Sequence, residues 1–244
     1  LLIISGARPD LVDKCGQTPL VIATHHNRSF ASLCLISPET TVPEVLIEDV
    51  EVDLSNVACN VQAVIYMARK TINMCSNEGM TPLRAAVLNK NYLLIEILQF
   101  FLADPNLQDS YGRTILYLLA LEGNIEISKR LLNPSSFMPN ELRDKVKRAN
   151  PILSDDEGRC PLHVAAWQGH LELAKLLVMS GVPIDTRDKE GRTPLQSAAW
   201  QGDAAMCQLL LEFGAQVDSI CKQSATALCI AAQENHYNVC RVLL

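Results

Sequence analysis

Two tryptophans, Trp167 and Trp200, stand 33 residues apart, and an arginine precedes each of them by eight residues, at Arg159 and Arg192. Indole rings and guanidinium groups dominate the hot spots of protein interfaces, because they bury a large area and still donate hydrogen bonds. A guanidinium also binds carboxylates through parallel N–H donors. These four residues therefore indicate recognition of an acidic, partly apolar peptide or partner loop, rather than a chemical reaction.

The rest of the sequence shows no arrangement typical of catalysis. No Ser/His/Asp order, paired carboxylates, cofactor motif or Gly-x-x-x-x-Gly-Lys-Ser/Thr phosphate loop stands out. His25 and His26 are adjacent, so on a helix their side chains point about 100° apart and do not chelate one ion. His163, His170 and His236 are expected to hydrogen-bond to backbone at turns and helix starts. We therefore expect no enzymatic activity, no cofactor and no metal.

Composition narrows the class of partner and the compartment. The net charge of −6 argues against a nucleic-acid partner, which requires a basic face. No apolar run approaches the roughly 20 residues that a membrane span needs. The nine cysteines are an odd number without zinc-type spacing, which favours reduced thiols and a cytoplasmic location.

The tryptophans belong to a repeated phrase. Residues 157–169 read EGRCPLHVAAWQG and residues 190–202 read EGRTPLQSAAWQG, and Thr-Pro-Leu recurs at 18–20 and 81–83. Proline fits the first turn of a helix, because that turn needs no N–H from it. Each phrase therefore predicts the start of a helix that carries a tryptophan, or its equivalent, near its end.

A period near 33 with this phrase resembles the ankyrin repeat, in which each unit has a β-turn and two helices. The resemblance covers essentially the whole chain and is most specific in the last third. It implies an all-α solenoid of about seven helix-turn-helix units with short β-turn fingers, in which each unit contacts only its neighbours. We expect one array over residues 1–244, with units at 1–12 (partial), 13–46, 47–75 (degenerate), 76–108, 109–154 (with an insertion), 155–187, 188–220 and 221–244 (partial).

Two segments depart from the regular period. Leu20 and Leu83 are 63 residues apart, which exceeds one period and falls short of two, so a degenerate unit is placed between them after a longer loop at 37–53. Gly112 and Gly158 are 46 residues apart, and the 13 extra residues fall within 133–154. In that insertion Glu141–Arg148 is expected to be a short helix with a basic face.

Both ends of the sequence fall within a repeat, and neither resembles the polar cap that a solenoid needs for solubility. We therefore expect the chain to be an excerpt from a longer array.

The resemblance implies that the finger tips and the exposed side of the inner helices line a concave groove. The two positions after each Ala-Ala pair should face that groove. The alternative is that both tryptophans are half-buried in packing between repeats. The expected partner-binding residues are Trp167, Gln168, Trp200, Gln201, Arg159, Arg192, Arg113, Tyr111, Leu121, Glu122, Gln233 and Glu234.

The phrases at 112–122, 196–202 and 225–234, together with the Trp-Gln-Gly blocks, are similar to the C-terminal repeats of one scaffold within the family. That similarity implies a role in endosomal recycling of membrane proteins, with peripheral membrane association through partners. The expected function is a protein–protein interaction scaffold. Two alternatives are a regulatory arm of a larger nucleotide-binding protein of the signal-transduction NTPase class, and a structural spacer.

Overall fold

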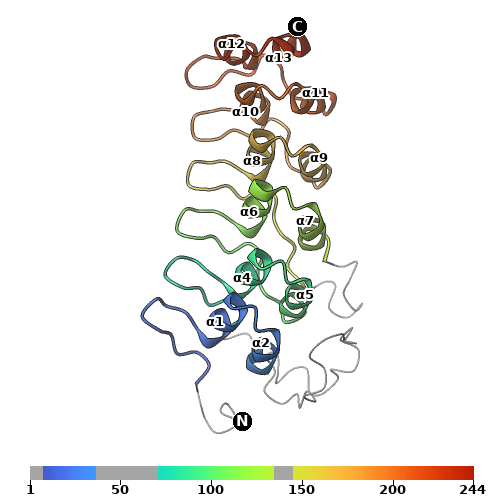
Figure 1. Ribbon diagram of the computed structural model, residues 1–244. Coiled ribbons are helices and arrows are strands. Elements are labelled where there is room, and N and C mark those ends of the chain that lie inside the picture. The colour runs from blue at the N-terminus through green and yellow to red at the C-terminus, as the bar shows by residue number, and fades with distance from the viewer. Residues whose placement is uncertain (1–7, 37–70, 135–144) are drawn as a thin grey trace. The chain divides into compact units, whose positions relative to one another are not determined.

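Residues 8–36, 71–134 and 145–244 are described in the computed structural model of the protein. They form short α-helices joined by turns, and no β-strand occurs in these three ranges (Figure 1). The chain divides into two compact units, one of residues 1–104 with 138–147 and one of residues 105–137 with 148–244. Each unit is built from helix pairs, as the all-α repeat architecture requires.

In the first unit, the described helices form two pairs. The inner helix α1 packs directly against the inner helix α4. Asn89, which caps the end of α4, donates through Nδ2 to the carbonyl oxygens of Thr24 and His25 at 2.9 and 3.0 Å. The pairs are α1 (Pro19–His25) with α2 (Ser29–Ile36), and α4 (Pro82–Leu88) with α5 (Tyr92–Phe100).

This direct contact differs from the expectation that a degenerate unit at 47–75 separates the two pairs. Most of that unit, and the loop expected at 37–53, lie outside the described residues. Spacing counts residues but does not say which helices touch, whereas the hydrogen bonds of Asn89 join the two pairs as neighbours.

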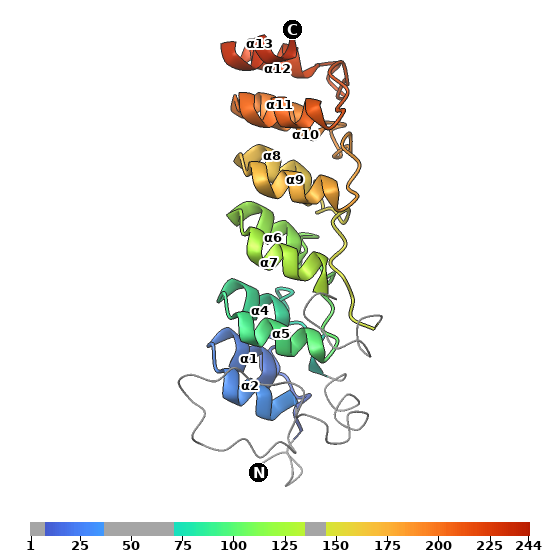
Figure 2. The ribbon, with the colours of Figure 1, turned by 90° about the vertical axis from the view of Figure 1, so that its right-hand side faces the viewer.

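The described residues of the second unit form four consecutive helix pairs. Inner helices α6, α8, α10 and α12 pack in sequence, and the outer helices α7, α9, α11 and α13 pack in a second row beside them (Figure 2). Each helix thus contacts its own partner and the equivalent helices of the adjoining repeats. The bounds are α6 (Ile115–Glu122), α7 (Ile125–Leu132), α8 (Pro161–Gln168), α9 (Leu171–Met179), α10 (Pro194–Gln201), α11 (Ala204–Glu212), α12 (Ala227–Gln233) and α13 (Tyr237–Leu243).

A threonine begins most inner helices for a specific reason. The side chain of Thr193 accepts a hydrogen bond from the N–H of Gln196, and Thr114 and Thr226 cap α6 and α12 in the same way. Such caps satisfy N–H groups of the first turn that have no partner inside the helix. The repeated Thr-Pro-Leu phrase is therefore a helix-start signal, as the sequence predicts.

Small side chains let the inner helices approach one another closely. Ala165 and Ala166 of α8 and Ala198 and Ala199 of α10 are fully buried. A leucine stands four residues before the second alanine of each pair. These buried leucines fill the remaining space, because protein interiors tolerate few voids. This packing fixes the spacing of neighbouring repeats and of the side chains at the helix ends.

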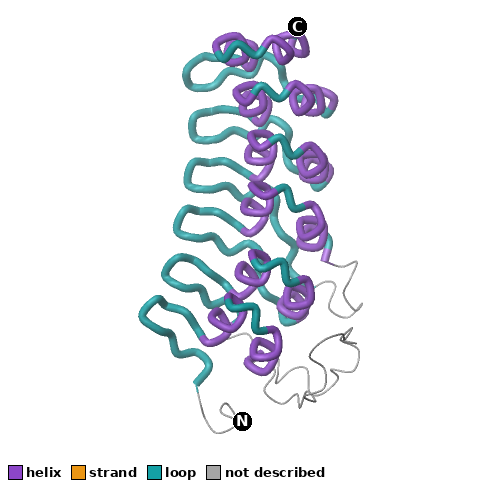
Figure 3. Tube along the Cα trace, viewed as in Figure 1, coloured by secondary structure: helices purple, strands orange, loops and turns teal. Residues whose placement is uncertain are grey.

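Within each unit, loops project from one side of the helix pairs as fingers, and Figure 3 draws the described fingers as loops and turns. Successive fingers of the second unit are joined by backbone hydrogen bonds: Lys189 N–H donates to the Glu157 carbonyl, and Lys222 N–H to the Glu190 carbonyl, both at 2.9 Å. These bonds satisfy backbone groups that a turn alone leaves open. The fingers are therefore held in register with the inner helices behind them.

The insertion differs from its prediction where it is described. Residues 145 and 146 form a turn and a bend rather than the end of a helix, and residues 135–144 lie outside the described part. Val146 is 6% exposed, and Lys147 Nζ lies 2.6 Å from Asp104 Oδ2. The buried valine and the ion pair hold this segment in an irregular conformation. The prediction of a helix with a basic face is therefore wrong for Lys145–Arg148.

Candidate partner-binding groove

The two indoles lie next to each other at the ends of α8 and α10. The ring centroids of Trp167 and Trp200 are 6.4 Å apart and the ring planes are tilted by 32°. The residues remain 42% and 40% exposed. Because each ring packs on its neighbour while keeping an open side, the indoles combine packing between repeats with an accessible apolar surface.

A cleft of about 250 Å³ opens beside the indoles in the second unit. Inner helices α6, α8 and α10 form its floor and the fingers form one rim. Of the residues expected from the sequence, Trp167, Gln168, Trp200, Arg159, Arg192 and Leu121 line it. The sequence analysis missed the other lining residues, which are Tyr117, His163, Val164, Asp188, Gln196 and Ser197.

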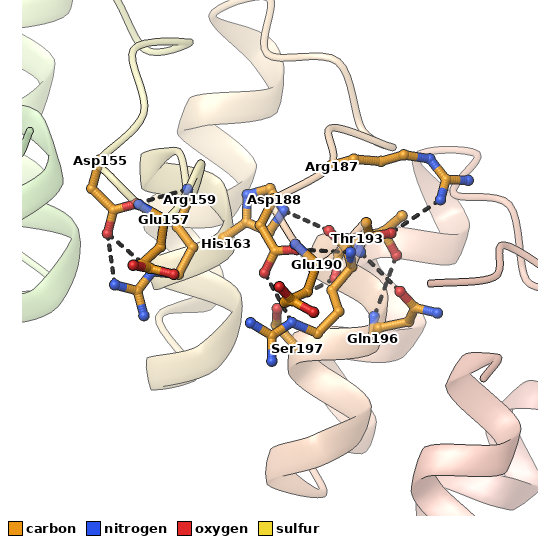
Figure 4. A network of polar contacts seen from close by, with 12 residues as sticks. Asp155, Glu157, Arg159, His163, Arg187, Asp188, Glu190, Thr193, Gln196 and Ser197 are labelled. Carbon is orange, nitrogen blue, oxygen red and sulfur yellow. Dashed lines mark hydrogen bonds and ion pairs between the residues drawn. The ribbon is translucent and has the colours of Figure 1, made fainter. Parts of the chain in front are cut away.

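Each groove arginine is paired with an aspartate of its own finger. Arg159 donates through Nε and a terminal nitrogen to Asp155 Oδ2 at 3.0 and 2.7 Å, and Arg192 donates through Nε to Asp188 Oδ2 at 2.9 Å (Figure 4). The two carboxylates are 3% exposed. Each guanidinium of the cleft therefore already has a counter-charge within its own finger, which the sequence analysis did not predict.

The aspartates also organise the finger backbone. Asp155 Oδ1 accepts from the N–H groups of Glu157 and Arg159 at 3.0 and 2.8 Å. Burial opposes ionisation of Asp155, but these donors and the Arg159 side chain outweigh it, so the pKa of its carboxyl lies below the usual value. Burial, followed by the nearby Asp155 carboxylate, raises the pKa of Tyr117 to about 12. The finger is thus held by a charged acceptor.

A second set of side chains ties each inner helix to the next finger. The Nε2 atom of His163 lies 3.0 Å from the Arg192 carbonyl oxygen. Gln196 Nε2 donates to the carbonyls of Ser219 and Ala225 at 2.9 and 2.8 Å. Both side chains come from the third residue of their helices, so the third helical position is the sequence signal that could have identified these two lining residues.

The family model described as ankyrin repeats (3 copies) matches residues 85–188 and 173–244, about two thirds of the chain. The chain belongs to the ankyrin-repeat family. No curated protein matches the sequence. Ankyrin repeats are generally protein–protein interaction modules rather than enzymes.

Within this ankyrin array, none of the helices in the described ranges is long and apolar enough to cross a bilayer. The same ranges contain no cluster of three His, Cys, Asp or Glu side chains suited to a metal ion.

The remaining expected residues divide between an adjoining cleft and the open surface. Tyr111 and Arg113 line a second cleft of about 290 Å³, which shares Arg159 and Leu121 with the first. The Arg113 guanidinium lies 4.6 Å from the centre of the Tyr111 ring, which is a cation–π distance. The other four expected residues are outside the lining of both clefts: Glu122, Gln201, Gln233 and Glu234.

Cys160 occupies the cap position of α8 where other ankyrin units of this chain have threonine. Its Sγ atom lies 3.2 Å from His163 Nδ1, and the residue is 2% exposed. Burial alone would raise the pKa of the Cys160 thiol. The contacts with His163 act in the opposite direction and together outweigh burial, which lowers the pKa to about 7. The thiol is enclosed, so its contact with His163 is a packing and capping interaction.

Replacing Cys160 by threonine is expected to stabilise the protein by about 0.5–1 kcal/mol, because a hydroxyl accepts the N–H of the first turn better than a thiol does. Thr81, Thr114 and Thr193 accept such bonds at 3.1–3.4 Å. The urea midpoint of Cys160→Thr should rise with an unchanged slope. An equal or lower midpoint would contradict this account of the cap.

Proposed function

We propose that the second unit binds an exposed segment of a partner protein in the groove at Trp167 and Trp200. The observation that supports this is the pair of neighbouring indoles, each about two-fifths exposed, on the floor of a cleft with a polar rim. Large exposed rings in a cleft cost free energy in water, and a partner that covers them removes that cost. The rigid stack behind them reduces the ordering cost of association.

The expected contribution of the indoles follows from their exposed area. An indole buries roughly 150–250 Å² when fully covered. Covering the exposed part of each ring therefore contributes about 2 kcal/mol before the costs of association are counted. Loss of both rings should weaken binding at least tenfold.

Affinity capture with the 244-residue protein tests this function. We compare the wild type with the variant carrying Trp167→Ala and Trp200→Ala, and expect the variant to lose the captured partner. Tyr237→Ala is the matched control, because Tyr237 is 71% exposed in the second unit but lies outside the groove on α13. Equal capture by the double variant, with circular dichroism showing an intact fold, would refute a binding site at the indoles.

The cellular role of the protein is proposed from sequence similarity. The phrases at 112–122, 157–169 and 190–202 resemble the C-terminal repeats of ankyrin repeat domain-containing protein 50. On that similarity, the scaffold acts in the cytoplasm in endosomal recycling of membrane proteins, and reaches membranes through its partners. Overlap of the tagged protein with endosomal markers tests this, and a diffuse distribution that excludes endosomes contradicts it.

We propose further, from the sequence, that the bound segment of the partner is acidic. This proposal is supported by Arg159 and Arg192 at the rim of the cleft. A partner carboxylate would have to compete with Asp155 and Asp188 for these guanidinium groups. Affinity for such a partner should fall steeply with salt, because charge attraction between exposed groups is screened.

A further inference from the structure

We propose that a second docking surface lies on the outer row of helices, and that it binds a partner segment in which carboxylates stand beside an apolar side chain. The surface is the insertion cleft, a hollow of about 690 Å³ between residues 148–151 and the ends of α7 and α9. In Figure 1 these two helices lie on the side of the second unit away from the fingers. Among the described residues, the insertion cleft and the groove at Trp167 and Trp200 share no lining side chain, so the inference goes beyond the proposed function.

The 13-residue insertion builds this cleft, because its last residues are tied to the end of α7. The Ala149 N–H donates to the Leu131 carbonyl at 2.9 Å. Asn106 donates through Nδ2 to the Arg148 carbonyl at 2.9 Å, and its Oδ1 accepts the Asn150 N–H at 2.7 Å. These bonds hold the backbone on both sides of Ala149, so the Arg148 side chain starts from a fixed position beside α7.

The charged side chains that line the insertion cleft are both cationic within the described ranges. Lys129 of α7 and Arg148 of the insertion are exposed, and no described residue forms an ion pair with either. The carbonyl groups at the ends of the two helices have other donors. The Lys129 carbonyl accepts the Asn133 N–H at 2.9 Å, and the Leu176 carbonyl accepts the Ser180 hydroxyl at 2.7 Å. The ammonium and guanidinium groups are therefore available to a carboxylate of a ligand.

Neighbouring charges on α7 and α9 leave the cleft positive. Lys175 is exposed on α9, four residues before the end of the helix, and so lies beside the cleft. The acids of these helices, Glu126 and Glu172, each precede a lysine by three residues. Glu126 is already paired with Arg130 at 3.3 Å. The excess of positive charge therefore attracts a partner segment that carries carboxylates.

The remaining wall of the insertion cleft is apolar. Met179, at the end of α9, is 72% exposed, and Leu132, Pro151 and Leu176 line the same hollow half-buried. Ile152, which follows Pro151, is 50% exposed. Exposed apolar side chains that lie together mark contact surfaces, and a methionine adapts its shape to different partners. An apolar side chain of the partner, next to its carboxylates, would cover this surface.

A polypeptide segment fits the insertion cleft better than an anionic membrane does. The whole chain has a net charge of −6, and a bilayer presents its negative charge over a wide area, so it would repel most of the protein. An acidic segment meets only the charges of the cleft, because charges beyond about 8–10 Å are screened at physiological salt. The occupant is therefore an acidic and apolar stretch of a partner protein.

Selection from a displayed library of random peptides of about twelve residues, which span about 40 Å when extended, tests the proposal. The immobilised 244-residue protein is the target, and a soluble Lys129→Glu/Arg148→Glu variant removes binders that do not need the cleft. We expect enriched peptides that combine Asp or Glu with Leu, Met or Phe. A synthetic consensus peptide should bind the soluble variant at least about tenfold more weakly than the wild type.

Two further variants separate the cleft from general effects of charge. Lys189→Glu/Lys222→Glu makes the same change in net charge at exposed finger residues, and should bind the consensus peptide as the wild type does. Met179→Ala removes an exposed apolar side chain of the cleft without touching its charges, and should weaken binding at least about threefold. Equal losses in the finger and cleft variants, or full affinity of Met179→Ala, would overturn the proposal.

The remaining outcomes separate the insertion cleft from the groove and from a membrane site. The consensus peptide should bind the Trp167→Ala/Trp200→Ala variant as tightly as the wild type. Peptides that need the indoles and keep their affinity for the Lys129→Glu/Arg148→Glu variant, or no enriched peptide at all, overturn the cleft and leave the groove untouched. Sedimentation with vesicles of phosphatidylcholine and phosphatidylserine in equal parts tests the membrane. Vesicle binding that is lost in the Lys129→Glu/Arg148→Glu variant would overturn the assignment of a polypeptide occupant.

Discussion

Replacing Gly158 by alanine should destabilise the second unit by about 2–4 kcal/mol. Gly158 has φ +76°, where an L-residue costs about 1 kcal/mol. An added Cβ would lie 2.8 Å from the Lys189 backbone nitrogen. That nitrogen donates to the Glu157 carbonyl, so relieving the clash must pull apart the hydrogen bond between two fingers, and overpacking of this kind costs a further 1–3 kcal/mol or so.

The matched control is Gly181→Ala. Gly181 has φ +93°, and an added Cβ meets no heavy atom within 4 Å. This variant should therefore lose only the free energy of placing alanine at a positive φ, about 1 kcal/mol. Urea unfolding of the two variants measures the difference. Equal losses of stability would show that close approach of the fingers is not what requires glycine at position 158.

Removal of the Asp155 carboxylate should cost about 2–4 kcal/mol. Asp155→Ala leaves the N–H groups of Glu157 and Arg159 and the guanidinium of Arg159 without the acceptor they use now. These bonds are partly buried, and the loss of a hydrogen bond to a charged acceptor costs about 1.5–3 kcal/mol. Asp156→Ala, at the adjacent exposed position, is the control and should fall within about 0.5 kcal/mol of the wild type.

The same carboxylate makes stability depend on pH in a predictable direction. Its pKa is lower in the folded protein than in the unfolded chain, where an aspartate titrates near 3.9. Its contribution is therefore complete above about pH 4 and is lost as the pH falls toward the folded pKa. Asp155→Asn should show a shallower loss of stability below pH 4 than the wild type. An identical pH profile for the two proteins would mean that Asp155 is not a stabilising anion.

Local patterns predicted the repeat architecture because short-range physics controls it. A threonine cap followed by proline and leucine begins a helix wherever it occurs, and α1, α4 and α10 all begin at such a proline. The ankyrin class and the exposed position of the indoles after the Ala-Ala pairs followed from the same phrase. The 33-residue period predicts that Trp167 and Trp200 are neighbours, and their ring centroids lie 6.4 Å apart.

Contacts between elements were harder to predict. The direct packing of α1 on α4 was missed because a 63-residue spacing does not reveal which residues remain in the stack. The ion pairs of the two groove arginines were not predicted, although the sequence contains the signal for them. Asp155 precedes Arg159, and Asp188 precedes Arg192, by four residues across one tight turn.

The central claim is that a partner covers the two indoles, and the indoles themselves report on it. Trp167 and Trp200 are the only tryptophans among the 244 residues, so fluorescence excited selectively at tryptophan comes from the groove alone. A tryptophan-free peptide that saturates the protein should shift the emission to shorter wavelength and reduce quenching by acrylamide by at least about half, because ring surface leaves water. Saturable binding with unchanged emission and unchanged quenching would contradict the account.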